Sequence, residues 1–267
     1  MARLSMNEMT TYRWSFDQDV TEYRAAGIPA IGVWRRKLAD FGEEKGIELL
    51  AEQGLAVSNL LWAGGFTGSD GHTFRESLDD AAEAIRLAAA LQARSLSVYS
   101  GSRAGHTHNH ARRLLSDALK QLIPLAQELH VVLALEPMHE ACAGECTFLT
   151  NLRDTLAVLD AAASPAVQLA FDVYHFGGDP AALALLPKFA GRIAIVHLAD
   201  GRPPTDQEQN RTRLGAGGVP LAEVIAALKG TGYDGDYDIE LIGQEIEATD
   251  YRDLLRHSLA AYQQLLG

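Results

Sequence analysis

The feature that most constrains the fold is a pattern that recurs along the whole chain: a short apolar run, a turn, and then an amphipathic helical stretch. Eight such units can be counted. Most of the runs are continuously apolar, as expected for strands that are buried on both faces. We predict strands at residues 5–9, 30–34, 56–61, 95–99, 131–136, 167–172, 193–197 and 237–241, and helices that include 79–92, 111–129, 152–162, 220–228 and 251–266.

Alternation of strands and helices implies parallel strands joined by right-handed crossovers. Eight units in 267 residues fit a closed (β/α)8 barrel, the TIM barrel of the α/β class, better than an open doubly wound sheet. No glycine-rich dinucleotide fingerprint follows the first strand, which weakens the doubly wound alternative further. We find no low-complexity linker and interpret residues 64–71 and 201–218 as loops on the barrel rim, so residues 1–267 are predicted to form a single domain.

Composition narrows the classes of partner. The net charge is −12, so the average field of the protein repels nucleic acid and anionic membrane surfaces. No long apolar run and no basic segment followed by an apolar one is present, and we expect a cytoplasmic protein. The two cysteines, Cys142 and Cys146, are interpreted as free thiols, because a structural zinc site would need a second pair of ligands.

Ionisable residues end four consecutive predicted strands. Barrel enzymes build their sites at the carboxyl ends of the strands, so these side chains should meet in one small volume. Taken singly, each is more often a helix cap, an ion-pair partner or a structural histidine. Together, three carboxylates would repel one another unless a cation lay between them. We therefore predict a site for one divalent metal ion, Mn²⁺ first with Mg²⁺, Co²⁺ or Zn²⁺ as alternatives, held by Glu136, Asp172, His197 and Glu240.

Five motifs occur in order along the second half of the chain. They are LALEPMH around Glu136, AFDVYHF around Asp172 and His175, IVHLADG around His197, NRTRLGAGG around Arg211, and YDIEL around Glu240. As an ordered set they make the chain resemble the xylose isomerase-like TIM barrel superfamily of sugar phosphate isomerases and epimerases. Within it, the resemblance is to the inosose isomerase and ketose 3-epimerase groups.

The resemblance implies roles for these residues. The four residues predicted above would bind the metal, and Glu136 and Glu240 would also exchange protons with a carbon next to the substrate carbonyl. His175 and Arg211 would contact substrate oxygens. The implied activity is a metal-dependent isomerase or epimerase that converts a keto-sugar or keto-cyclitol through an enediolate. A lyase or dehydratase acting on an oxidised sugar is the alternative, and a non-catalytic sugar-sensing barrel is a third possibility.

Some positions leave the assignment open. Arg202 and Arg213 compete with Arg211 for the substrate-binding role, and Leu214 stands where the family usually has proline. Pro220 replaces an acidic or polar residue near a helix start. Trp34, which is followed by three cations, is predicted to stack on a sugar ring.

Two further expectations concern metal and assembly. His72, His106, His108 and His110 could suggest a second metal site, as in the endonuclease branch of the superfamily, where additional histidines bind metal. We disfavour such a site because the later part of the chain lacks the extra pair of histidines found in that branch. Family members often pair through barrel helices or rim segments, and a homodimer is expected on that ground.

Overall fold

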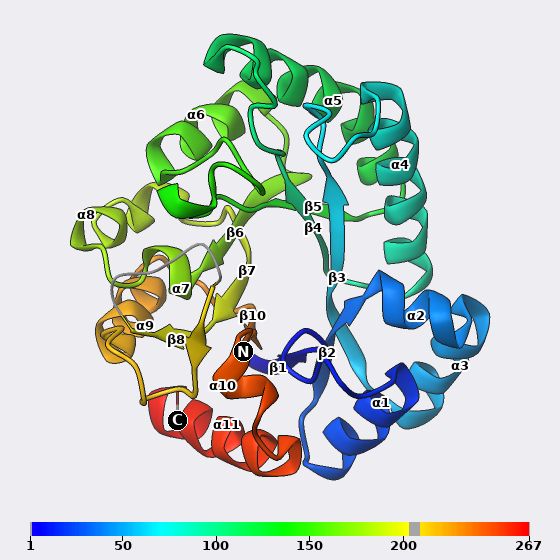
Figure 1. Cartoon of the computed structure of the whole chain (residues 1–267), viewed down its shortest axis with the longest axis vertical. Helices are drawn as coiled ribbons and strands as arrows, with labels where there is room; N and C mark the ends of the chain where they lie inside the picture. The colour runs from blue at the N-terminus through cyan, green and yellow to red at the C-terminus, as the bar shows by residue number, and fades with distance from the viewer. Residues whose placement is uncertain (1, 203–208, 267) are drawn as a thin grey trace.

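The computed structural model describes residues 2–202 and 209–266, and its strands close into a barrel (Figure 1). Neighbouring strands are parallel, and their order around the barrel is β1-β10-β7-β6-β5-β4-β3-β2. The predicted (β/α)8 fold is confirmed, and each predicted strand is present. The eight are β1 (Arg3–Asn7), β2 (Ala30–Trp34), β3 (Ala56–Gly64), β4 (Ser95–Tyr99), β5 (Val132–Leu135), β6 (Val167–Asp172), β7 (Ile193–Leu198) and β10 (Asp236–Ile239).

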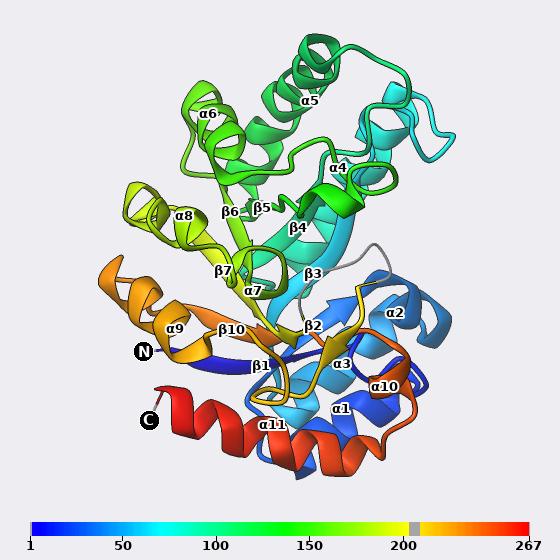
Figure 2. The ribbon, with the colours of Figure 1, turned by 60° about the vertical axis from the view of Figure 1, so that its left-hand side comes forward.

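Helices surround the barrel on its outside (Figures 1 and 2). Among the described residues, none of them is long and apolar enough to cross a membrane. The longer helices are α1 (Phe16–Ala25), α2 (Arg35–Phe41), α3 (Glu43–Gln53), α4 (Phe74–Ala90), α5 (His108–Glu128), α6 (Leu152–Ala162), α9 (Leu221–Gly230) and α11 (Tyr251–Leu266).

Helix starts differ most from prediction where a capping residue, rather than an apolar one, sets the boundary. The helix predicted from residue 79 begins at Phe74, because Thr73 and Glu76 form a capping box that satisfies the first amide groups. In the same way, α5 begins at His108 because the Thr107 hydroxyl accepts from the His110 amide. In α5 the first buried side chain is that of Ala111, so the apolar periodicity starts three residues after the helix does.

Two βα units are irregular. After β6 the chain forms two short helices, α7 (Val173–Phe176) and α8 (Pro180–Leu183), instead of one long helix. After β7 it forms a small antiparallel hairpin of β8 (Asp200–Gly201) and β9 (Arg211–Thr212). Residues 203–208 of the rim loop predicted at 201–218 lie outside the described residues. Both irregular segments follow strands that carry predicted metal ligands.

Strand periodicity separates two environments inside the molecule. Alternate residues such as Leu133, Leu169 and Val196 face the surrounding helices and join the main apolar core. The residues between them face the barrel interior, where Ala134, Ala170 and Ile195 form a small separate cluster. Two residues further along β5, β6 and β7 stand Glu136, Asp172 and His197, so the same period of two directs these polar groups inward above that cluster.

Candidate metal centre

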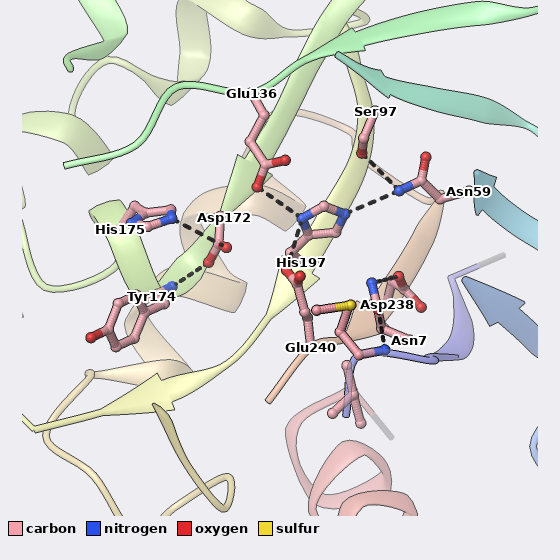
Figure 3. Close-up of polar contacts among 12 residues, drawn as sticks. Asn7, Asn59, Ser97, Glu136, Asp172, Tyr174, His175, His197, Asp238 and Glu240 are labelled. Carbon is pink, nitrogen blue, oxygen red and sulfur yellow. Dashed lines mark hydrogen bonds and ion pairs between the residues drawn. The ribbon is translucent and has the colours of Figure 1, made fainter. Parts of the chain in front are cut away.

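The four predicted ligands meet at the carboxyl end of the barrel (Figure 3). Glu136 directly follows β5, Asp172 ends β6, His197 lies next to the end of β7, and Glu240 directly follows β10. One ligand atom from each residue lies within 4.8 Å of those of the others, and all four residues are buried. The tertiary structure therefore brings together residues that span more than one hundred positions of sequence.

His197 lies between the two glutamates. Its Nδ1 atom is 3.1 Å from Oε1 of Glu136 and 3.3 Å from Oε2 of Glu240. In the barrel order, β7 and β6 separate the strands that carry these two carboxylates. Glu136 and Glu240 thus approach the imidazole from different sides of the site (Figure 3).

The two carboxylate oxygens of Asp172 have different partners, one in the backbone and one in the cluster. Its Oδ1 atom accepts a hydrogen bond of 2.7 Å from the amide of Tyr174, which caps α7. Its Oδ2 atom accepts from Arg211 at 2.8 Å. The helix-cap explanation and the metal-ligand explanation of this carboxylate are therefore compatible, because each uses a different oxygen.

Arg211 reaches the cluster from β9, and its side chain is almost completely buried. Its guanidinium donates to Oδ2 of Asp172, and also to the Oε2 and backbone oxygens of Glu240, at 3.1 and 2.9 Å. It lies over the Tyr174 ring, with 4.9 Å between Cζ and the ring centroid. The planar guanidinium thus ties the hairpin to two carboxylates that come from different strands.

The two carboxylates that Arg211 contacts have pKa values shifted in opposite directions. Burial is the largest influence on Asp172 and raises its pKa, but Arg211, His175, His197 and the Tyr174 amide together outweigh burial, so the pKa lies below its usual range. For Glu240, burial dominates over Arg211 and His197, and the pKa is raised. Burial would also lower the pKa of His197, yet the carboxylates of Glu136 and Glu240 raise it to about 10.

The donor set fits a divalent cation. The raised pKa of His197 places a proton on the imidazole, which a metal bound at Nδ1 would displace; with that ring neutral, the three ionised carboxylates carry three negative charges, of which Arg211 compensates one. The remaining charge of about two in a buried volume is what a divalent ion would neutralise. Carboxylate oxygens with one imidazole suit Mn²⁺, Mg²⁺ or Zn²⁺, and His197 directs Nδ1 at the carboxylates, where it would coordinate. The residues present therefore fit the metal that the sequence predicts.

Polar residues inside the barrel hold His197 from its other side. Nε2 of His197 lies 3.3 Å from the side-chain nitrogen of Asn59, which donates to Oγ of Ser97 at 2.8 Å. Nearby, the side chain of Asn7 donates to Asp238 at 2.8 Å. Burial raises the pKa of Asp238 to about 7. Figure 3 shows these contacts. Sequence reasoning missed these supports, although polar residues inside otherwise apolar strands were a usable signal.

The residues predicted to contact substrate lie in different surroundings. His175 is buried on α7, with Nε2 3.8 Å from Oδ2 of Asp172, so it adjoins the site rather than facing solvent. Trp34 ends β2, where its ring stacks on Trp62 at a centroid distance of 6.5 Å and meets Tyr12 at 5.8 Å. His175 thus adjoins the four predicted ligands, whereas Trp34 belongs to a group of aromatic side chains on the rim.

The three candidate arginines are separated by their positions. Arg202 is largely exposed and pairs with Glu245, and Arg213 is half-buried, whereas Arg211 lies in the cluster. Leu214, which stands where proline was expected, is buried, and its carbonyl accepts from His257.

Asp200 holds the loop that follows β9, a role that sequence reasoning missed. Its carboxylate accepts from the amides of Gly215, Gly217 and Val219 at 2.9 to 3.1 Å. A Cβ atom on Gly217 would lie 2.1 Å from Oδ1 of Asp200, so this close approach requires glycine. The carboxylate therefore fixes the loop backbone without the proline that the family usually has.

Two predictions concerned the other histidines and the two cysteines. His72, His106, His108 and His110 form no group of three or more potential metal ligands in the described part of the chain. Both cysteines are free thiols, as predicted. However, Cys142 is buried and lies with His139 and His175 in a second group of potential ligands, which the spacing of cysteines alone gave no reason to expect.

A closed eightfold barrel with such a cluster at the carboxyl ends of its strands is typical of metal-dependent barrel enzymes. The model of the family described as xylose isomerase-like TIM barrel matches residues 20–263, and the chain belongs to this family.

Solved structures share the whole fold at low sequence identity. Protein SMc04130 from Sinorhizobium meliloti is 24% identical, with a TM-score of 0.91 and 98% of each chain covered. The IolI protein, solved with a zinc atom, is 17% identical with a TM-score of 0.86, covering 99% of this chain and 98% of that one. D-allulose 3-epimerase from Methylomonas sp., in complex with D-allulose, is 20% identical with a TM-score of 0.80, covering 98% and 96%.

Proposed function

We propose that the protein is a divalent-metal-dependent isomerase or epimerase that acts on a keto-sugar or keto-cyclitol through an enediolate. The observation that carries the proposal is the position of His197 Nδ1 between the Glu136 and Glu240 carboxylates, with Asp172 in the same cluster. Family membership supports a sugar-converting enzyme, and a relative of the same fold was solved with D-allulose. We propose Mn²⁺ as the preferred ion because carboxylate oxygens dominate the ligand set.

Glu136 and Glu240 are the proposed acid and base. When bound, a divalent ion supplies a Lewis acid that polarises a substrate carbonyl and makes the neighbouring carbon more acidic. One glutamate removes the proton from that carbon. The other, which approaches from a different strand and a different side of His197, delivers a proton to the opposite face or to the next carbon. The face and carbon to which the proton returns decide between epimerisation and aldose–ketose isomerisation.

The remaining residues orient the substrate. His175 adjoins Asp172, and we propose that its imidazole contacts a substrate hydroxyl. Arg211 is held by Asp172 and Glu240 in a fixed plane, which suits the binding of a substrate oxygen next to the reacting carbon. For Trp34, which stacks on Trp62 at the rim, we propose contact with the sugar ring.

Deuterium exchange from solvent tests the acid–base assignment. Glu136→Gln and Glu240→Gln should each slow exchange into a responsive keto-sugar or keto-cyclitol by about 100-fold or more, since acid–base catalysis contributes about 10²–10⁴. Glu140→Gln and Glu245→Gln change exposed carboxylates close by in sequence and should exchange normally. Metal content is measured in parallel because both active-site glutamates are proposed ligands. Full exchange in both active-site variants would refute the proposal.

The mass of the product separates this proposal from the alternative. Isomerisation and epimerisation conserve mass, whereas a lyase or dehydratase that starts from the same enediolate expels water or another leaving group. A product lighter by one water, formed at the rate of deuterium exchange, would replace the isomerase proposal with a dehydratase.

A further inference from the structure

Beside the first cluster lies a second group of potential metal ligands of different chemistry, formed by His139, Cys142 and His175. His139 and Cys142 come from the loop after β5, at the two ends of a short 3-10 turn, η1 (Glu140–Cys142), in which the Cys142 amide donates to the His139 carbonyl at 3.0 Å. His175 comes from α7, after β6. One ligand atom from each lies within 4.8 Å of the others, and Cys142 and His175 are buried.

The two imidazoles face each other. Nδ1 of His139 lies 2.5 Å from Nδ1 of His175, and Nε2 of His139 lies 4.0 Å from Sγ of Cys142. Two ring nitrogens at such a distance must share a proton or turn their lone pairs to a cation. Around a tetrahedral zinc ion, bond lengths of about 2.0 Å to nitrogen and 2.3 Å to sulfur separate the ligand atoms by about 3.3 to 3.6 Å. One ligand atom of each residue lies within 4.8 Å of the other two, so side-chain movements of about 1 to 1.5 Å would bring one His139 nitrogen, the His175 nitrogen and the thiolate to this geometry.

His175 provides an independent observation. Its side chain is completely buried, and its Nε2 atom has no hydrogen-bond partner among the described residues. The carboxylate of Asp172 lies 3.8 Å away on that side. If Nδ1 coordinates a cation, the ring proton must be on Nε2, which then faces this carboxylate. Histidines that bind metals commonly direct their second ring nitrogen at a carboxylate in this manner.

We propose that His139, Cys142 and His175 form a second divalent-cation site, specific for a zinc-like ion. Thiolate and imidazole ligands select zinc or cobalt, whereas the carboxylates of the first cluster suit Mn²⁺ or Mg²⁺, so the two sites have different preferences. Three protein ligands leave a fourth position open, as in catalytic rather than structural zinc sites. The site does not require the proposed isomerase activity, but an ion here would occupy the imidazole of His175, so this role replaces the contact with a substrate hydroxyl proposed above for that residue.

Cobalt spectroscopy of the full-length protein tests the second site directly. Co²⁺ added to chelator-treated protein should produce a thiolate-to-cobalt charge-transfer band in the near ultraviolet, and Zn²⁺ should displace it. Cys142→Ser should abolish the band, whereas Cys146→Ser, which changes the other thiol, should keep it. His197→Ala removes a ligand of the first cluster only and should also keep the band, which separates this test from the proposed function.

Stoichiometry and a second variant complete the test. Wild type should bind two Co²⁺ ions per chain and Cys142→Ser one. His139→Ala leaves both cysteines in place and should lower the affinity for the Co²⁺ ion that produces the band by more than about tenfold. Circular dichroism checks the fold of every variant. A wild type without the band, or a band that Cys142→Ser and His139→Ala leave unchanged, would overturn the proposal.

Discussion

Arg211 is a buried cation that bonds two of the clustered carboxylates, Asp172 and Glu240. Removing one partner of a buried ion pair leaves a charge without compensation. We expect Arg211→Met to lower the free energy of unfolding of chelator-treated protein by about 3–5 kcal/mol, and added Mn²⁺ to restore part of it. Denaturant unfolding with and without Mn²⁺ measures both effects. Arg202→Met, at a largely exposed arginine, is the control, and an equal loss there would contradict the assignment.

Asn59 is predicted to position His197, one of the proposed metal ligands. If Nδ1 of His197 binds the ion, Nε2 keeps its proton and needs an acceptor, which Asn59 provides when its amide turns its oxygen towards the ring. Asn59→Leu should therefore weaken metal affinity by about 10- to 100-fold, whereas Asn59→Asp should not. Competition with a fluorescent chelator measures the affinity. Equal affinity in wild type and Asn59→Leu would show that the amide does not act through His197.

At the scale of an element, α4 depends on its first turn. The hydroxyl of Thr73 accepts from the Glu76 amide, and the Glu76 carboxylate accepts from the Thr73 amide. Thr73→Ala should cost about 1 kcal/mol of unfolding free energy, and Thr73→Ser, which keeps the hydroxyl, should cost much less. Thermal or denaturant unfolding compares the two variants. Similar losses in both would mean that the methyl group, and not the cap, matters at this position.

Elements were the most predictable level of the structure. Strands β2, β4 and β6 have the predicted bounds, because burial on both faces leaves a continuous apolar run that ends where the chain turns. The helix starts at Phe74 and His108 were predicted too late, because caps lie outside the apolar periodicity. The short helices after β6 were not predicted, since four-residue helices carry too little pattern to recognise.

At the scale of the whole molecule, the barrel closes where β1 pairs with β10. Arg3 donates to both carboxylate oxygens of Asp236 at 2.6 and 2.9 Å, at the first residue of each strand, and Asp236 is buried. Arg3→Ala should reduce the unfolding free energy by about 2 kcal/mol. It should leave metal content unchanged, because the four proposed ligands lie at the other end of the strands.

An exposed ion pair is the matched control for barrel closure. Arg75 pairs with Asp79 on the surface of α4, and Arg75→Ala should change unfolding free energy by less than about 0.5 kcal/mol. Denaturant unfolding compares the two variants. Equal losses of unfolding free energy in Arg3→Ala and Arg75→Ala would contradict the role of the Arg3–Asp236 pair in barrel closure. Release of metal from Arg3→Ala would contradict it too.

The sequence by itself determined the barrel and the residues that form the buried cluster at its rim. Apolar runs indicate buried strands, and side chains along a strand point alternately inward and outward. Ionisable residues at the ends of such runs lie at the rim where barrel enzymes build their sites, so Glu136, Asp172 and His197 were identified before their distances were known. Parallel closure then brings the ends of all the strands to one rim.

Only the tertiary structure decided which loop residues reach that rim. The sequence could not choose Arg211 over Arg202 and Arg213, because the choice depends on how the hairpin folds back over the barrel. Nor could it place His139 and Cys142 beside His175, since those side chains come from loops after different strands. Loop paths are set by capping, glycine conformation and side-chain contacts at close range, and these leave no periodic signal in a single sequence.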